Sequence, residues 1–593
     1  MPAPYQAPLD DMAFLLNHVT GLKRTQGLPE FGECTADVAQ AVLREAARFA
    51  QEVISPLNAS SEQQPPSVTH GVVTTSPGYR DAYQQFVAAG WNGLSSPEDF
   101  GGQGLGQALS TAVSEMWQSA SMSFGLCPML TAGAIHAIEH HASPDLQRIF
   151  LERLVSGQWT GTMNLTEPQA GSDLAAITTK AIPSGDHYLI KGSKIYITYG
   201  EHDMAENIVH LVLARLPDAP AGVKGISLFI VPKYLVNENG SLGARNDLIC
   251  ASLEHKVGIH GSPTAVMRYG DHNGAIGYLV GEPHQGLAYM FTMMNHARLQ
   301  VGLQGVAVSQ RSLQLASAYA QERVQGRTLL GQSDGSAPIA LHPDVQRMLL
   351  TMRAKTQAMR ALALEAATEL DLTLQSDQQA ASRAQTRVDL LIPIVKGWCT
   401  EQSVEITSMG VQIHGGMGYI EETGAGQLWR DARITPIYEG TTAIQANDLV
   451  GRKILRDQGA AVMELLGEIQ ATARVLRSTD DPRLNRLGDQ LEQASQVLQS
   501  CVSGCLETAR TDNASVYFGS VPLLMLCGSV LGGWMLARAA LACHHEGDLI
   551  EAQVRRDQTR LALVYGDLCL MPSLGLAHMI SHAGETLRAT LEP

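Results

Sequence analysis

The sequence predicts an α+β protein of several domains, in the order helices, strands, helices and a further block of helices. The chain has 593 residues, which is enough for several hydrophobic cores. Hydrophobic residues make up 45% of it and charged residues 17%, as in a globular protein rather than a disordered one. The hydrophobic period changes from helical to strand-like and back along the chain, and these changes mark the domain boundaries.

Four domains follow from this pattern. Residues 1–160 are predicted to form an N-terminal helical domain, because segments such as ADVAQAVLREAARFAQEVI place apolar residues at helical spacing. Residues 161–285 are predicted to form a β domain, because short β-branched runs such as GISLFIVPKYLV alternate with turn residues. Long helical patterns return over residues 286–455, and residues 456–593 are predicted to form an extra helical domain. This order is not the alternating pattern of a Rossmann domain.

Charge and cysteine content narrow the function classes. The net charge of −16 argues against a general nucleic-acid binder, so no nucleic-acid partner is expected. Nine cysteines without a C-x-x-C pair indicate reduced thiols, and the first residues lack the pattern of a secretory signal. A cytoplasmic location is therefore expected. No metal site is expected, because the adjacent residues Cys543, His544, His545 and Glu546 would point in different directions on a helix.

One uncharged stretch, Asn513 to Ala537, is long enough to span a membrane. Glycines and a proline interrupt it, so a buried helix of an all-α domain is favoured. The alternative is a surface that contacts a membrane.

Two motifs lie near the start of the β domain. LTEPQAGSD, Leu165 to Asp173, forms a turn whose amides and hydroxyls could contact a ligand, although a plain surface turn explains it equally well. KIYITYG, Lys194 to Gly200, is a predicted strand on which Tyr196 and Thr198 share one face. An aromatic ring beside a hydroxyl could line a flavin, but a half-buried strand alone is the simpler explanation.

Three more motifs lie in the second helical region. ERVQGR places Arg323 at a helix end, where a guanidinium can reach a pyrophosphate or simply face solvent. QIHGGMGYI, from Gln412, has more glycines than a helix cap needs. ITPIYEGTTAIQ contains Glu439 in uncharged surroundings, which raise the proton affinity of a carboxylate and suit a general base. The alternative for Glu439 is an acid at a helix start, with Thr441 or Thr442 as the cap.

In this order the motifs resemble the acyl-CoA dehydrogenase family over nearly all of residues 10–455. TEPQAGSD is similar to the family's T-E-P-x-A-G-S-D motif, and KIYIT is similar to its K-x-W-I-T/S strand. ERVQGR, QIHGGMGYIEE and RDARITPIYEGT follow at family-like spacing. The chain length and the helical block after residue 456 further resemble a longer bacterial subgroup, labelled 3-methylmercaptopropionyl-CoA dehydrogenase-like.

The resemblance implies a β-barrel-like middle domain, a C-terminal four-helix bundle, and FAD held between domains and at a subunit interface. Glu439 would be the catalytic base. The implied cofactor-binding residues are Met163, Leu165, Thr166, Ser172, Tyr196, Thr198, Arg323, Gln412, Gly415, Gly416, Thr441 and Gln445. The implied substrate-binding residues are Ser172, Asn295, Arg298, Glu439 and Gly440. Tyr196 replaces the usual Trp, and Asn295 replaces the usual Asp, which puts that CoA contact in doubt.

The implied activity is FAD-dependent dehydrogenation of a saturated acyl-CoA to trans-2-enoyl-CoA, as in fatty acid β-oxidation. A straight medium to long chain is expected, with 3-methylmercaptopropionyl-CoA as the alternative. A second alternative is a flavin-binding relative with little dehydrogenase activity. An electron-transfer flavoprotein is the expected electron acceptor, oxygen being the alternative. The extra helical block favours a homodimer.

Overall fold

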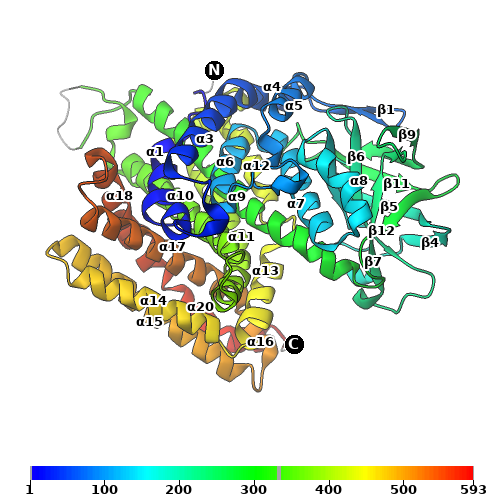
Figure 1. Cartoon of the computed structure of the whole chain (residues 1–593). Coiled ribbons are helices and arrows are strands. Elements are labelled where there is room, and N and C mark those ends of the chain that lie inside the picture. Colours follow the sequence, from blue (N-terminus) through cyan, green and yellow to red (C-terminus); the bar gives the residue numbers. More distant parts are fainter. Residues whose placement is uncertain (1–2, 330–334, 592–593) are drawn as a thin grey trace. The chain divides into compact units, whose positions relative to one another are not determined.

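The computed structural model describes residues 3–329 and 335–591 (Figure 1). The chain divides into two compact units. The first, called the helical unit, contains residues 1–48, 106–119 and 298–593. The second, called the sheet unit, contains residues 49–105 and 120–297. The predicted α+β fold class, with N-terminal helices, a middle β domain and C-terminal helices, is confirmed.

The sheet unit is built on an eight-stranded sheet in the order β10-β11-β5-β12-β7-β6-β3, with β4 beside β5 and β6. Most neighbouring strands are antiparallel, but β3 runs parallel to β6. Small and branched side chains such as Ile190, Val212 and Ala265 are buried on it and form its core. The strands are β3 (Trp159–Asn164), β4 (Lys180–Ser184), β5 (His187–Thr198), β6 (Asn207–Arg215), β7 (Ile226–Pro232), β10 (Leu248–Leu253), β11 (Thr264–Tyr269) and β12 (Ala275–Leu279), with a separate hairpin of β8 (Tyr234–Val236) and β9 (Leu242–Arg245).

Helices and a small hairpin complete the sheet unit. They are α4 (Ser55–Gln63), α5 (Tyr79–Ala88), α7 (Met122–His141), α8 (Pro144–Val155), the first turns of α9 (Gly286–Glu322), and the strands β1 (Ser67–Thr69) and β2 (Val72–Thr74). The hairpin β1–β2 lies in a region predicted to be helical, and that prediction was wrong there. Strands of three residues are too short to show a period of two.

Long helices form the helical unit. Its centre contains the rest of α9, α10 (Pro343–Leu372) and α11 (Gln378–His414), followed by α12 (Ala425–Ile434) and α13 (Thr442–Asp448). Gly302 and Gly305 let α9 approach α11 closely, since a Cβ on Gly305 would lie 2.6 Å from the Cys399 carbonyl oxygen. The first residues add α1 (Leu9–His18), α2 (Gly21–Thr25) and α3 (Ala36–Phe49). Helix α6 (Gln107–Ala120) belongs to the same unit and is joined to α10 by the buried ion pair of Glu115 with Arg360.

The residues after 456 continue the helical unit. They form α14 (Ala460–Arg477), α15 (Pro482–Thr508), α16 (Asn513–Phe518), α17 (Ser520–His545), α18 (Ala552–Tyr565), α19 (Met571–Ser573), α20 (Leu576–Ser581) and α21 (Ala583–Leu591). Among the described residues, two runs are long and apolar enough to span a membrane, Ser520–His545 and Ala552–Ser581. The first is 78% buried in its most apolar window, in agreement with the predicted buried helix. The second is only 28% buried and was not singled out from the sequence.

Gly528 on α17 allows this helix to pack against Trp398 of α11. A Cβ at Gly528 would lie 2.1 Å from Trp398 Cγ, and Trp398 is fully buried. The glycines that interrupt α17 therefore serve close helix packing.

We predict that Gly528→Ala destabilises the protein by about 1–3 kcal/mol, because the added methyl overpacks this contact. The melting temperature should fall accordingly. Gly467→Ala on α14 is the matched control, because a Cβ there meets nothing within 4 Å, and it should be neutral or stabilising. Equal melting temperatures for Gly528→Ala and the wild type would mean that α17 does not pack against α11 in this way.

Candidate active site

Glu439 lies in the short loop between α12 and α13, in a strained backbone conformation. Its φ is +55° and that of Gly440 is +89°, in the left-handed region that non-glycine residues avoid. Thr441 caps α13 by accepting a hydrogen bond from the Ile444 amide at 3.3 Å. The buried Gln445 donates from Nε2 to the Glu439 carbonyl oxygen at 3.2 Å. The loop is therefore held on both sides of Glu439.

Two buried cations act on the Glu439 carboxylate. Burial raises the pKa of Glu439 to about 7, while Arg298 and Lys396 oppose this rise by favouring the charged form. Arg298 belongs to α9 and Lys396 to α11, and both side chains are buried. Burial lowers the pKa of Lys396 to about 7, although the charge of Glu439 opposes that change. The two groups therefore titrate in the same range and influence each other.

Lys396 also holds the backbone of the Glu439 loop through a hydrogen bond. Its Nζ donates a hydrogen bond to the Gly440 carbonyl oxygen at 2.5 Å. Lys396 was not predicted from the sequence, although a single lysine within the apolar run LLIPIVKGW was a visible signal. A lysine in such a run must be paired or satisfied inside the fold.

The hydroxyl groups of Tyr438 and Thr442, on either side of Glu439, are hydrogen-bonded to other side chains. The Tyr438 hydroxyl donates to Gln304 Oε1 on α9, and burial raises the pKa of Tyr438. This phenol stays protonated at neutral pH and cannot act as the base. Thr442 Oγ1 donates to Glu401 Oε1 at 2.6 Å. Glu439 has a proton affinity that suits a base at neutral pH.

In the sheet unit, the TEPQAGSD motif is organised by a buried ion pair. Lys194 Nζ lies 2.8 Å from Glu167 Oε1 and donates to the Leu165 carbonyl oxygen at 2.9 Å. Although burial raises its proton affinity, Lys194 and the donors of Thr178 and Thr179 hold the pKa of Glu167 at about 2. Both charges lay inside the recognised motifs, but their pairing across 27 residues was not predicted.

The two predicted flavin-lining motifs meet in the sheet unit. The Ile195 amide donates to the Thr166 carbonyl oxygen at 2.9 Å, so the end of β5 lies beside the TEPQAGSD turn. A bulge in β5 opposite Val266 gives Tyr196 a φ of +60° and leaves its side chain exposed. Thr198 is half-buried, and so are Met163 and Thr166, whereas Leu165 is buried and Ser172 is exposed.

The remaining predicted residues lie in three places. Arg323 directly follows α9, is exposed, and donates to Gln325 Oε1 at 2.6 Å. Gln412 is near the end of α11, and Gly415 and Gly416 follow it with open space where a Cβ would be. Asn295 is exposed on α9, three residues before the buried Arg298.

These residues fit a large polar cofactor. The buried Gln445 Oε1 has no hydrogen-bond partner among the described residues, so a ligand would satisfy it. The Gly415–Gly416 turn, in which Gly415 has a φ of +59°, has open space where a Cβ would be, so a ligand can approach its backbone closely. FAD, implied by the sequence, is a ligand of the right kind for both features.

Four family profiles match successive parts of the chain. They are the acyl-CoA dehydrogenase N-terminal domain over residues 37–158, its middle domain over 162–271, its C-terminal domain over 284–455, and an acetyl-CoA dehydrogenase C-terminal-like domain over 465–590.

Two curated relatives match over most of their length. The chain is 49% identical to the 3-methylmercaptopropionyl-CoA dehydrogenase of Ruegeria pomeroyi, over 91% of this chain and 92% of the relative. It is 35% identical to a broad-specificity linear acyl-CoA dehydrogenase of Mycobacterium tuberculosis, over 90% of each.

Solved structures with the same fold include an acyl-CoA dehydrogenase of Bacillus anthracis complexed with FAD. Its TM-score is 0.75 at 20% identity, covering 97% of this chain and 92% of that one. Caenorhabditis elegans ACDH-11 in complex with C11-CoA has a TM-score of 0.77 at 22% identity, covering 96% and 92%.

Proposed function

Because this chain belongs to the acyl-CoA dehydrogenase family, we propose that it is an FAD oxidoreductase that converts a saturated acyl-CoA to the trans-2-enoyl-CoA. The observation that carries the proposal is Glu439, a carboxylate with a pKa of about 7 in a strained, braced loop beside two buried cations. Such perturbed groups gather at functional sites.

Glu439 is the residue that removes the α-proton. A base is most effective when its pKa lies near the working pH, and burial brings Glu439 to that range. Arg298 and Lys396 keep a fraction of it ionised at neutral pH, since without them burial would protonate it further. When bound, FAD supplies the ring that accepts the β-hydrogen as hydride.

An α-proton of a thioester is too weakly acidic for a carboxylate to remove unaided, so the enolate charge must be stabilised. The family resemblance assigns this role in part to the backbone N–H of Glu439. A donor of this kind is worth about 3–4 kcal/mol in the transition state. The φ of +55° at Glu439 sets the direction of this amide, and the bonds from Lys396 and Gln445 fix it.

The substrate class we propose is a linear acyl-CoA, and a straight medium to long chain is the version expected from the sequence. A specific observation favours a second candidate, 3-methylmercaptopropionyl-CoA. The chain is 49% identical to an enzyme named for that substrate, against 35% for the broad-specificity linear enzyme. The thioether is itself short and unbranched, so both candidates need a narrow pocket.

The physiological setting completes the proposal. We propose an electron-transfer flavoprotein as the electron acceptor, a homodimer as the assembly and the cytoplasm as the location. Fatty acid β-oxidation is the proposed context for the medium to long substrates. Stoichiometric hydrogen peroxide from the purified enzyme would replace the proposed acceptor with oxygen.

Anaerobic mixing of the holoenzyme with a panel of acyl-CoAs tests the activity and the substrate together. The panel contains straight chains of increasing length and 3-methylmercaptopropionyl-CoA. We expect flavin bleaching with linear members of the panel, and the preferred length separates the two candidates. An FAD-loaded protein that no member bleaches would instead be a flavin-binding relative with little dehydrogenase activity.

Glu439→Gln tests the assignment of the base. The turnover number should fall by about 10²–10⁴-fold, because an amide cannot accept the proton, while the FAD content stays unchanged. Glu405→Gln is the matched control, since Glu405 is an exposed acid of α11 that pairs with Lys355. Substantial dehydrogenation by Glu439→Gln would place the base elsewhere.

Lys396→Met tests the role of the buried cation through pH. In the wild type, kcat/KM should rise with pH through about 7, because only the deprotonated Glu439 accepts a proton. Losing a neighbouring positive charge raises the pKa of Glu439 further, so the rising limb should move up by about one pH unit.

Lys396→Arg is the control for this experiment because it keeps the charge, and its limb should stay at or below that of the wild type. A Lys396→Met profile that coincides with the wild-type profile would show that Lys396 acts only by packing. The FAD content of each variant separates electrostatic effects from loss of the fold.

A further inference from the structure

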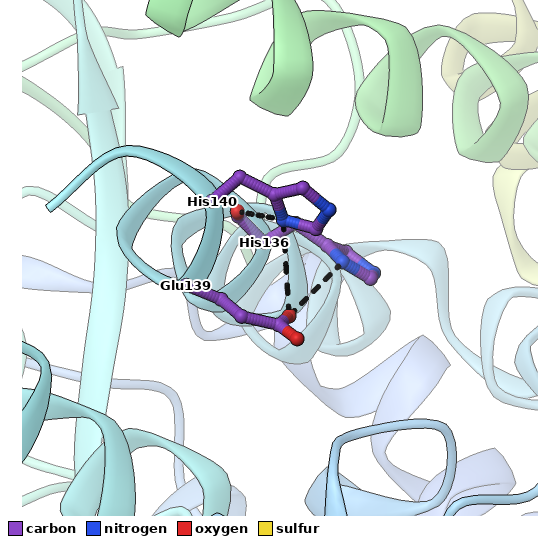
Figure 2. A group of neighbouring side chains, drawn as sticks. All are labelled: His136, Glu139 and His140. Atoms are coloured by element: carbon purple, nitrogen blue, oxygen red, sulfur yellow. Dashed lines mark hydrogen bonds and ion pairs between the residues drawn. The ribbon is translucent and has the colours of Figure 1, made fainter. Parts of the chain in front are cut away.

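The last turns of α7, in the sheet unit, present a cluster of metal-ligating side chains outside the site described above. His136, Glu139 and His140 stand three and four residues apart in the sequence, and this spacing places them on one face of the helix (Figure 2). One imidazole nitrogen from each histidine and one Glu139 oxygen lie within 4.8 Å of one another. Glu139 Oε2 lies 3.9 Å from Nδ1 of both histidines.

A third histidine lies against this cluster. The ring of His296, on the part of α9 that belongs to the sheet unit, is 4.9 Å from the ring of His136, centroid to centroid. The neighbouring His141 is engaged otherwise, since its Nε2 lies 2.6 Å from Thr292 Oγ1 and its ring stacks on Tyr289. His296 therefore offers a further imidazole beside His136.

The side chains of this cluster are the kinds that bind metal. His136, Glu139 and His296 are half-buried, and His140 is exposed. A neutral imidazole keeps a lone pair for an ion, and Glu139 can supply a charge that balances part of a divalent cation. His140 Nδ1 bonds the His136 carbonyl oxygen at 2.8 Å, so binding through that nitrogen exchanges this bond for the metal.

We propose that His136, Glu139 and His140 bind a zinc ion, with His296 as the fourth ligand. Three imidazoles and a carboxylate, without a thiolate, form a set typical of Zn²⁺ rather than of Mg²⁺ or Ca²⁺. Zinc bonds of about 2.0–2.2 Å require ligand atoms to be closer together than the 4.8 Å span, so the side chains must move inward by about 1 Å.

The site has a defined consequence for the fold. With His296 as a ligand, the ion would join the end of α7 to the first turns of α9 inside the sheet unit. Zinc should therefore raise the thermal stability of the protein, since an ion that binds only the folded state stabilises it. His140 is exposed, which gives the ion access from solvent.

Other groups of possible metal ligands are hydrogen-bonded to other side chains or lack a complete set of ligands. Glu546, beside His544 and His545, is hydrogen-bonded to His18 and Lys23. The nine cysteines are all free, and eight of them are buried. The exposed His578 on α20 and His582 directly after this helix have i,i+4 spacing, but no carboxylate completes a cluster with them among the described residues. This pair is therefore a matched control for unspecific binding to paired histidines.

The experiment uses the full-length FAD-loaded protein after treatment with a chelator. Calorimetric titration with zinc chloride should show one tight site. His136→Ala and Glu139→Gln should each weaken it by more than about 100-fold, because even outer-shell partners contribute 10- to 100-fold. His296→Ala should weaken it less if the other three ligands remain. The double variant His578→Ala, His582→Ala should bind like the wild type.

Zinc-edge X-ray absorption of the wild type is the second measurement, and it does not depend on any variant folding. The expected spectrum has only nitrogen and oxygen neighbours at about 2.0–2.1 Å, with imidazole outer shells. A sulfur neighbour at about 2.3 Å would move the ion to a cysteine and overturn the proposal. Unchanged zinc affinity in His136→Ala, or the absence of any tight site in the wild type, would overturn it as well.

Discussion

The chemistry proposed for this protein depends on how one carboxylate is kept out of water yet partly ionised. Burial alone would protonate Glu439, and the two buried cations Arg298 and Lys396 limit that effect. Each cation comes from a different long helix, α9 and α11, so the charge state of Glu439, the proposed base, depends on the packing of these helices. Gly302 and Gly305 let α9 approach α11, so they contribute indirectly to the pKa of Glu439.

The same residues also control geometry. Lys396 bonds the carbonyl oxygen of Gly440 and Gln445 bonds that of Glu439, so the strained loop is fixed by side chains from α11 and α13. A non-glycine residue at a φ of +55° needs such support, because strain persists only where the surroundings enforce it. In the sheet unit, the pair of Glu167 and Lys194 plays a comparable role for the TEPQAGSD turn. In both places a buried lysine holds the backbone of a loop that contains predicted site residues.

Much of the fold and part of the candidate site could be predicted from the sequence, and the features that were missed were missed for physical reasons. The order of helices and strands followed from hydrophobic period. Glu439 was predicted as the base because an acid in uncharged surroundings is unusual and because its motif resembles that of the family. The hairpin β1–β2 was missed because its strands are too short for a period. Lys396 was missed because its partner lies 44 residues away along the chain, and only packing brings the two together. The bulge at Tyr196 depends on the register of β11, which no local pattern encodes.

The most direct test of the central claim is an infrared titration of the holoenzyme, taken as the difference between wild type and Glu439→Gln so that only the carboxyl band of Glu439 remains. The structure predicts a midpoint at about pH 7, because burial outweighs the two cations. A midpoint near 4.5, the value of an ordinary glutamate, would show that Glu439 is solvated and would contradict this account of the base.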